Sequence, residues 1–431
     1  MNHAEPVFQR SVIDDDPQDG YFLRAVDVDG DGRPDLVASG LTRGQVVWYQ
    51  NPSWTKRTIV SLGDRKPVAL DAADLTGDGL PDLVLCHDYG NCMFDCGPRD
   101  GVISWLRNPG PDGWDGPWTR SHVADLVACH RVRLGRFTTD NRLQLVALPV
   151  VGPQGGAEGV GSAVRLMLYD VPDDPVAHAG EWRGQPLDTT DFTIVHGVVA
   201  ARFPGTPHPE RESFVLATGE GISWLGAGTG SGPGDGWQVR KIGDGVPPQA
   251  SVENPEHRFS GSGNLGVARI GGRPCAVILA VEPFHGNTLS VYVRPPGTVS
   301  PFDMPWERRQ LRVLDPPDAT HDAVGHHVVV ADFDGDGDDE FLVGLRGPAP
   351  AQGVFYFKFD TSGNVLVEKQ VSTDSTARIA VADFDGDGRL DFATTAYDTV
   401  GYYEIPDPKV CLFTNAFGVP GPVMAPPGAD G

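Results

Sequence analysis

The chain has 431 residues, 40% hydrophobic and 21% charged, and its 55 glycines and 38 prolines suit many short strands joined by tight turns. A net charge of −24 argues against nucleic acid or an anionic membrane surface as a partner. No apolar run could span a bilayer, the first residues resemble no signal peptide, and six cysteines suggest no disulfide framework. We therefore expect a cytoplasmic protein without a membrane partner.

The strongest pattern is an acidic loop between two apolar runs, and it occurs four times. Alternate carboxylates point inward, and glycines permit the tight turn, which together form a cage for a hard cation. An EF-hand loop would continue to a twelfth-position glutamate and a helix, whereas here the last carboxylate is the ninth residue and a β-like run follows. We expect Ca²⁺ or Mg²⁺ in these loops, bound by Asp27, Asp29, Asp31 and Asp35; Asp74, Thr76, Asp78 and Asp82; Asp332, Asp334, Asp336 and Glu340; and Asp383, Asp385, Asp387 and Asp391.

The loops belong to a repeat that occurs seven times. Aligned on the first loop residue, the copies are centred on positions 27, 74, 136, 202, 269, 332 and 383, and the middle three keep the first strand but lack the acidic loop. A second strand follows, then a third that is often aromatic, such as residues 46–49, and a fourth that often opens with a tryptophan. Seven four-stranded units predict an all-β fold, a seven-bladed β-propeller.

The seventh unit ends after its third strand, at residues 410–413. Residues 8–13 resemble the outer strands of the other units, so we expect the N-terminal strand to complete the seventh blade and close the ring. The sequence thus predicts one propeller domain over residues 1–417 and a flexible, Pro/Gly-rich tail over residues 418–431.

Six of the twelve histidines fall on one face of the expected propeller, opposite the acidic loops: His87, His130, His196, His285, His321 and His326. Three of them, His130, His196 and His326, each stand six residues before the aligned position, where the first strand begins near the axis. Imidazoles from separate rigid elements, with one coordination position open, are what a zinc site needs, and a further imidazole can act as a general base. The alternative is that these histidines only cap strand ends and hydrogen-bond across the channel.

At these histidines the sequence resembles the N-terminal propeller of the aldos-2-ulose dehydratase family, fungal enzymes that act on 1,5-anhydro-D-fructose. The resemblance is carried by residues 128–132, 195–197, 284–292, 321–326, 331–343 and 401–408, and the acidic repeat is of the FG-GAP/VCBS type. It covers nearly the whole chain. The family enzyme continues into two cupin domains associated with isomerisation and assembly, whereas this sequence ends after the propeller, so only the dehydratase step is expected.

The resemblance implies a zinc-dependent dehydratase with structural divalent cations in the acidic loops. It implies His196, His285 and His326 as zinc ligands and His130 as the base. The expected reaction is a β-elimination: with the ketone of a keto sugar polarised by zinc, His130 removes the adjacent proton and the β-hydroxyl leaves as water.

Other residues of the same face are expected to assist. A proton donor for the leaving hydroxyl is expected among His321, Tyr397, Tyr402 and Glu404. Substrate contacts are expected from Arg378, Tyr397, Glu282 and Asp88, although Arg378 could instead form a salt bridge to Asp88 or Glu282.

Two other functions fit the same pattern. The same residues could eliminate an alcohol or aglycone from a 3-keto-glycoside, and a propeller with acidic loops could bind carbohydrate or protein without any reaction. The oligomeric state stays open, a homodimer being one option. The spacing of Cys86, His87, Cys92 and Cys96 lacks the usual zinc pairing, so free thiols are expected there.

Overall fold

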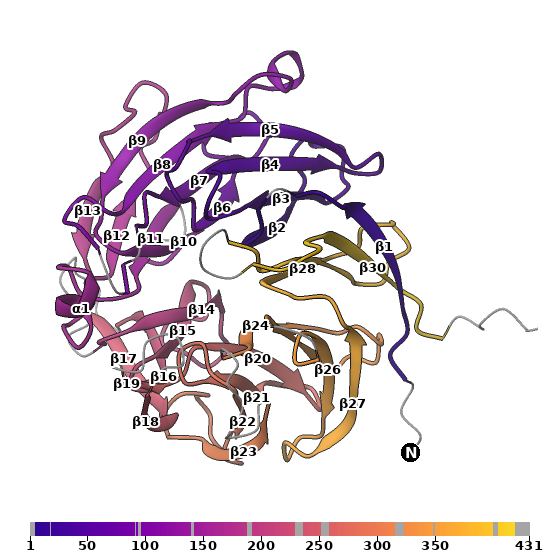
Figure 1. Ribbon diagram of the computed structural model, residues 1–431. Helices are drawn as coiled ribbons and strands as arrows, with labels where there is room; N and C mark the ends of the chain where they lie inside the picture. Colours follow the sequence, from indigo (N-terminus) through magenta and orange to yellow (C-terminus); the bar gives the residue numbers. More distant parts are fainter. Residues whose placement is uncertain are drawn as a thin grey trace, which may run out of the picture.

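The computed structural model describes residues 5–17, 19–90, 92–93, 96–138, 142–187, 192–228, 236–250, 258–314, 323–347, 350–399 and 404–418. Within these residues the strands form seven four-stranded sheets and one two-stranded sheet. The four-stranded sheets are arranged as blades around a central axis (Figure 1). The predicted seven-bladed, all-β fold is therefore confirmed.

The first four blades follow the chain in order. Each is an antiparallel sheet in which the first strand lies nearest the axis and the fourth is outermost (Figure 1). Blade 1 contains β2(Phe22–Val26), β3(Asp35–Ser39), β4(Gln45–Gln50) and β5(Thr55–Ser61); blade 2 contains β6(Ala69–Ala73), β7(Asp82–His87), β8(Val102–Arg107) and β9(Thr119–Asp125). Blade 3 contains β10(Cys129–Gly135), β11(Gln144–Pro149), β12(Met167–Asp170) and β13(Arg183–Pro186); blade 4 contains β14(Val195–Arg202), β15(Glu212–Thr218), β16(Gly221–Ala227) and β17(Trp237–Gly243).

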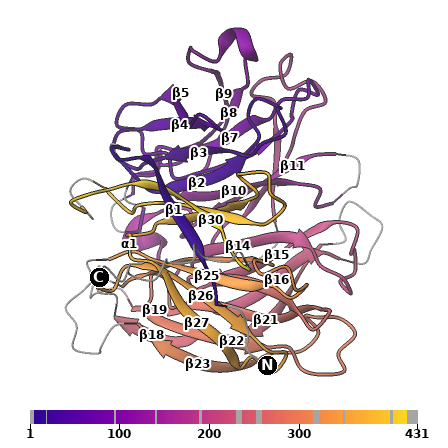
Figure 2. The same ribbon diagram turned by 90° about the vertical axis from the view of Figure 1, so that its right-hand side faces the viewer.

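The remaining three blades complete the circle, and the last one uses both ends of the chain. Blade 5 contains β20(Asn264–Ile270), β21(Arg273–Glu282), β22(Thr288–Val293) and β23(Glu307–Val313); blade 6 contains β24(Gly325–Ala331), β25(Glu340–Leu345), β26(Gly353–Phe359) and β27(Val365–Ser372). Blade 7 contains β28(Arg378–Ala382), β29(Asp391–Thr395), β30(Val410–Asn415) and β1(Phe8–Asp14). β1 pairs antiparallel with β30, with Phe8 opposite Asn415, so the predicted ring closure by the N-terminal strand is confirmed (Figure 1 and Figure 2).

Apolar packing between blades forms the core. Each innermost strand contacts the innermost strand of the next blade, around the whole ring back to β2. Aromatic residues of the third strands are buried between the sheets, as with Trp48, Trp105 and Tyr169 in the cluster that joins blades 1 to 3. The alternation of each strand thus places its apolar residues against a neighbouring blade.

Some features were not predicted. A hairpin of β18(Val246–Ala250) and β19(Arg258–Gly261) lies between blades 4 and 5, and two short helices, α1(Gly156–Gly159) and the 3₁₀ turn η1(Pro111–Gly113), interrupt the loops. Within the described residues, no helix is long and apolar enough to cross a membrane. Of the predicted tail over residues 418–431, all but the first residue lies outside the described residues.

The ninth residue of an acidic loop braces the backbone. In blade 2, Asp82 is fully buried, and its two carboxylate oxygens accept hydrogen bonds from the backbone N–H groups of Leu75 (3.2 Å) and Asn108 (2.8 Å). The equivalent residues Asp35 and Asp391 accept corresponding pairs of backbone hydrogen bonds. These carboxylates therefore stabilise the loop whether or not a cation is bound.

The asparagine that follows the third strand joins neighbouring blades. The side chain of Asn108 donates from Nδ2 to the Val28 carbonyl in the blade 1 loop (2.9 Å) and to the Pro81 carbonyl (3.2 Å). Asn51 reaches the blade 7 loop at the Phe384 carbonyl (2.8 Å), and Asn415 reaches the blade 6 loop at the Phe333 carbonyl (2.7 Å). We call these three residues the asparagine staple, because each holds one blade to the loop of the preceding blade.

Replacing Asn108 with alanine is expected to destabilise the protein by about 2–3 kcal/mol, because two buried backbone carbonyls lose their donors. The measurement is urea unfolding followed by tryptophan fluorescence. Asn364→Ala is the control, since Asn364 is exposed and hydrogen-bonds only within its own turn. Equal midpoints for the two variants would contradict a blade-joining role for the staple.

Candidate metal centre

Three histidines occupy the same position in three innermost strands. His130, His196 and His326 are each the second residue of their strand, β10, β14 and β24. In all three strands the pairing with the second strand shifts at this residue, which marks a β-bulge. The first-to-second-strand pairings of blades 1, 2 and 7 show no such shift. A bulge re-aims a side chain, and here it accompanies an imidazole in each case.

A fourth histidine reaches the same place from a loop. His285 follows β21, and its ring stacks on Phe284 with centroids 4.2 Å apart. Its Nε2 lies 3.2 Å from Nε2 of His196, and the ligand atoms of His196, His285 and His326 all lie within 4.8 Å of one another. We call these three residues the histidine centre. The sequence indicated this set, and the structure brings all three together.

Backbone carbonyls orient two rings of the centre. His196 donates from Nδ1 to the Gly263 carbonyl (2.7 Å), and His326 donates from Nδ1 to the Ala377 carbonyl (2.5 Å). A neutral imidazole with its proton on Nδ1 presents a lone pair at Nε2. His326 Nε2 is buried and has no hydrogen-bond partner among the described residues. Such carbonyl contacts are the usual outer support of a histidine that binds a metal.

The electrostatics keep these rings neutral. Burial lowers the pKa of His196 and of His326 well below the ordinary histidine range. Neighbouring positive charge lowers both pKa values further, from the His285 imidazole and from Arg131 or Arg378. A neutral imidazole is the form that binds a metal ion.

The centre fits a zinc ion. Tetrahedral zinc with Zn–N bonds of about 2.0–2.1 Å keeps its nitrogen ligands roughly 3.3 Å apart, close to the 3.2 Å between His196 and His285. Arg131 Nη2 lies 3.5 Å from the same His196 nitrogen, a contact that a bound cation would displace. Three imidazoles would leave one coordination position for a further ligand.

His130 lies beside the centre rather than in it. Its ring stacks on His196 at 5.0 Å between centroids, and its Nε2 contacts the Tyr21 hydroxyl (3.0 Å) and Arg131 Nη1 (3.1 Å). A guanidinium only donates, so His130 Nε2 is the acceptor and the neutral ring carries its proton on Nδ1. That Nδ1 is buried without a partner among the described residues. Tyr21 was not singled out in the sequence, because no repeat marks its position.

Two buried arginines make the site positive. Arg131 is 1% exposed and Arg378 is 4% exposed. Arg378 lies over the Phe22 ring, 5.4 Å from its centroid, and its Nε and Nη2 have no hydrogen-bond partner among the described residues. Among the described residues, neither arginine forms an ion pair with a carboxylate. Buried positive charge without a counter-ion favours an anionic oxygen in a ligand or transition state.

The two carboxylates expected near Arg378 lie elsewhere. Glu282 is fully buried, with its carboxylate bound by the Tyr292 hydroxyl and by Arg308 (2.7 and 3.0 Å), toward the outer strands of blade 5. Asp88 pairs with Arg65 at 3.4 Å. Neither forms the salt bridge to Arg378 that we considered, and the engaged carboxylate of Glu282 is not available for substrate.

The remaining residues expected on this face do not share one environment. Tyr397 packs edge-on against His326, with ring centroids 5.0 Å apart. His87 turns into blade 2, where Nε2 contacts the Ser104 hydroxyl at 2.9 Å. Glu404 is exposed. His321 and Tyr402 lie outside the described residues.

The acidic loops differ more than their sequences suggested. Possible ligand atoms gather in blades 1, 6 and 7, at Asp27, Asp29 and Asp35; Asp332, Asp334 and Asp336; and Asp383, Asp385 and Asp391. In blade 2, where Thr76 stands in place of an aspartate, no such group forms among the described residues, although Asp74 accepts backbone hydrogen bonds from two loop glycines as Asp332 and Asp383 do. In blade 6 the ammonium of Lys358 contacts Asp334 and Glu340, so a side-chain cation lies among the carboxylates of this loop.

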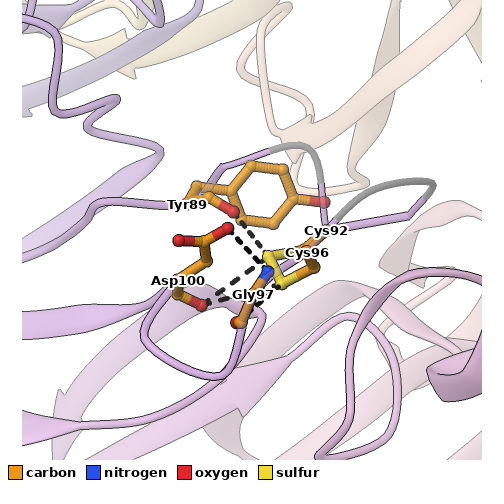
Figure 3. Close-up of a disulfide and its surroundings, with 5 residues drawn as sticks. All are labelled: Tyr89, Cys92, Cys96, Gly97 and Asp100. Carbon is orange, nitrogen blue, oxygen red and sulfur yellow. Dashed lines mark hydrogen bonds between the residues drawn. A yellow bond between two sulfur atoms is a disulfide. The ribbon is translucent and has the colours of Figure 1, made fainter.

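The cysteine expectation is wrong at one pair. Cys92 and Cys96 form a disulfide in the loop after β7, next to Asp100 (Figure 3). The Asp100 carboxylate accepts a hydrogen bond from the Gly97 N–H (2.8 Å). The same loop carries Tyr89, whose ring lies 5.3 Å from the His130 ring. Sequence spacing could not show that these two sulfur atoms meet.

Sequence comparisons match two family models and one characterised protein. Residues 100–295 match the family model of the aldos-2-ulose dehydratase β-propeller domain, and residues 27–85 match an FG-GAP-like repeat. Aldos-2-ulose dehydratase of Phanerodontia chrysosporium is 31% identical over 435 residues, which cover 96% of this chain and 46% of that protein. The chain therefore spans about half the length of the curated relative it matches.

Solved structures support the fold alone. The structure of U3-55K is similar with a TM-score of 0.53 at 11% identity, covering 95% of this chain and 100% of that one. The RRP9 WD40 repeats give a TM-score of 0.52 at 10% identity, covering 96% and 99%. By sequence, this chain is similar to aldos-2-ulose dehydratase, and residues 100–295 match the model of its β-propeller domain, in agreement with the resemblance noted from the sequence.

Proposed function

We propose that the protein is a zinc-dependent lyase that eliminates water from a keto sugar such as 1,5-anhydro-D-fructose or an aldos-2-ulose. The histidine centre is the observation that carries this proposal, since His196 and His326 present Nε2 lone pairs fixed by backbone carbonyls. The similarity to aldos-2-ulose dehydratase supports dehydration as the reaction.

His196, His285 and His326 would hold the zinc ion. When bound, zinc supplies Lewis acidity that polarises the carbonyl group of a substrate and makes the adjacent C–H group more acidic. The backbone carbonyls of Gly263 and Ala377 keep two of these rings in the tautomer and orientation that binding needs.

The neighbouring side chains would move the proton. His130 is the proposed base, and the Tyr21 hydroxyl is hydrogen-bonded to its Nε2. The tyrosine oxygen can take a proton from the substrate while its own phenolic proton passes to His130, so that the pair acts as a proton relay. The same pair can return a proton to the leaving hydroxyl. Arg131 and Arg378 would stabilise the negative charge that develops on the substrate oxygen.

The acidic loops of blades 1 and 7 are the proposed sites of structural Ca²⁺ or Mg²⁺. Each gathers three carboxylates, and the facing position of the third strand carries a neutral side chain, Gln50 or Thr414. A divalent cation there would relieve the repulsion among the carboxylates and stiffen the turn.

Removing a zinc ligand should abolish both zinc binding and reaction. In His326→Asn the asparagine amide can keep the hydrogen bond to Ala377, whereas the Nε2 ligand is lost. We expect about one zinc per wild-type chain by elemental analysis, and at least roughly 100-fold weaker zinc binding in the variant. Enone absorbance from 1,5-anhydro-D-fructose or glucosone should rise with the wild type but not with His326→Asn. His178→Asn, at an exposed histidine, is the control.

The outcomes separate the possible functions. Zinc without enone from either sugar, but with release of aglycone from a 3-keto-glycoside, would favour elimination of an alcohol by the same residues. Wild-type protein that binds no zinc would end the lyase proposal and favour a carbohydrate- or protein-binding propeller.

Tyr21→Phe should lower kcat by roughly 10²–10⁴-fold while zinc content stays unchanged, because the proton path through the hydroxyl is lost but no zinc ligand is. Tyr169→Phe, at a buried tyrosine on β12, is the matched control. Unchanged kcat in Tyr21→Phe would assign proton transfer to His130 alone.

The zinc-free protein should lose stability as the pH falls below about 6.5. The folded-state pKa values of His196 and His326 are lowered, so the unfolded chain binds more protons in that range and their contribution is complete only above it. His326→Asn should therefore show a shallower fall in Tm between pH 7 and 5.5 than the wild type. Parallel curves would contradict a neutral, buried His326.

A further inference from the structure

The four acidic loops face different residues across the sheet. The pairing of the second and third strands shows which residue lies opposite the ninth loop position. The residue after the ninth position is paired in the four blades as Leu36–Tyr49, Leu83–Leu106, Phe341–Phe357 and Phe392–Phe413. The residue that follows the second member of each pair therefore lies opposite the ninth position. These facing residues are Gln50, Arg107, Lys358 and Thr414. Four loops of similar sequence thus have four different partners, and only the partner in blade 6 is a buried lysine.

The Lys358 ammonium is surrounded by carboxylates. Its Nζ lies 2.6 Å from Asp334 Oδ2, 2.8 Å from Asp336 Oδ2 and 2.8 Å from Glu340 Oε1. The side chain is 3% exposed. An ammonium has three N–H groups, and each meets one carboxylate, so its hydrogen bonding is complete. Burial disfavours the charged amine, but the three carboxylates outweigh it and raise the pKa of Lys358.

Two further changes in blade 6 accompany this lysine. The ninth loop residue is Glu340, whereas the other three loops have aspartate. The longer side chain lets Oε2 accept from the Phe333 N–H (2.8 Å) while Oε1 meets Lys358. The residue after Lys358 is Phe359, where blades 1, 2 and 7 carry the asparagine staple. Blade 6 therefore differs from the other three at three neighbouring positions.

A divalent cation could enter this loop only by displacing the ammonium. The displaced Lys358 ammonium would be left buried without its carboxylate partners, which is unfavourable. The blade 1 and blade 7 loops carry no such cost, because Gln50 and Thr414 are uncharged.

We propose that the ammonium of Lys358 is the permanent cation of the blade 6 loop, so that this loop binds no divalent metal and becomes a Ca²⁺ site only when the ammonium is removed. This proposal does not depend on the lyase activity or on zinc, because loop and histidine centre lie at opposite ends of β24.

The test is Ca²⁺ stoichiometry by equilibrium dialysis with ⁴⁵Ca²⁺ on zinc-loaded protein. Lys358→Thr installs the residue of blade 7, and we expect it to bind one more Ca²⁺ per chain than the wild type, with a larger Ca²⁺-dependent rise in Tm than the wild type shows. Adding Asp334→Asn to Lys358→Thr should remove the extra ion. Lys369→Thr is the control, since the Lys369 side chain is half-exposed and its ammonium pairs with Glu5 rather than with a loop carboxylate.

Two results would overturn the proposal. One is a folded Lys358→Thr variant that binds no additional Ca²⁺. The other is a wild-type chain that loses one Ca²⁺ on Asp334→Asn, which would mean that the native loop already holds a metal. The second measurement needs no change at Lys358, so it decides the matter even if Lys358→Thr fails to fold; an unchanged count there supports the resident ammonium.

Discussion

The pairing of β1 with β30 is the contact on which the arrangement of the whole protein depends. It joins residues more than 400 positions apart, Phe8 and Asn415, and completes the seventh blade. Because the ring is closed, each innermost strand is held between two neighbours, and the starts of these strands meet near the axis. The histidines come from blades 3 to 6, and they meet because the innermost strands of these consecutive blades stand side by side in the ring.

Closure brings the strands together, but bulges and carbonyls aim the side chains. In a regular strand, successive side chains point to the two faces of a sheet, and neither direction is toward the axis. A bulge at His130, His196 and His326 releases the ring from that alternation. Neighbouring blades then supply the carbonyls, Gly263 of blade 5 for His196 and Ala377 of blade 7 for His326. Two of the three proposed ligands are thus oriented by a blade other than their own.

The two ends of the innermost strands carry opposite charge. The end with the histidines has buried arginines without carboxylate partners in the described residues, whereas the opposite end has clustered carboxylates. Strands of five to eight residues separate them by roughly 15–25 Å. Positive charge at one end suits a substrate oxygen that gains negative charge. At the other end the loops stabilise the ring, through backbone hydrogen bonds to the ninth carboxylate, the asparagine staple and the ammonium in blade 6.

Sequence alone determined the features that repeat. Seven copies of one pattern predict seven blades, the incomplete last copy predicts closure by the first strand, and equal offsets place three histidines at one height. These features depend on the spacing of residues along the chain, which folding does not change. Only the tertiary structure decided which residues face one another across different copies. Examples are the contacts of Tyr21 with His130, of Glu282 with Arg308, of Lys358 with an acidic loop and of Cys92 with Cys96. Such contacts depend on side-chain direction and on neighbouring strands, and spacing along the sequence does not determine either.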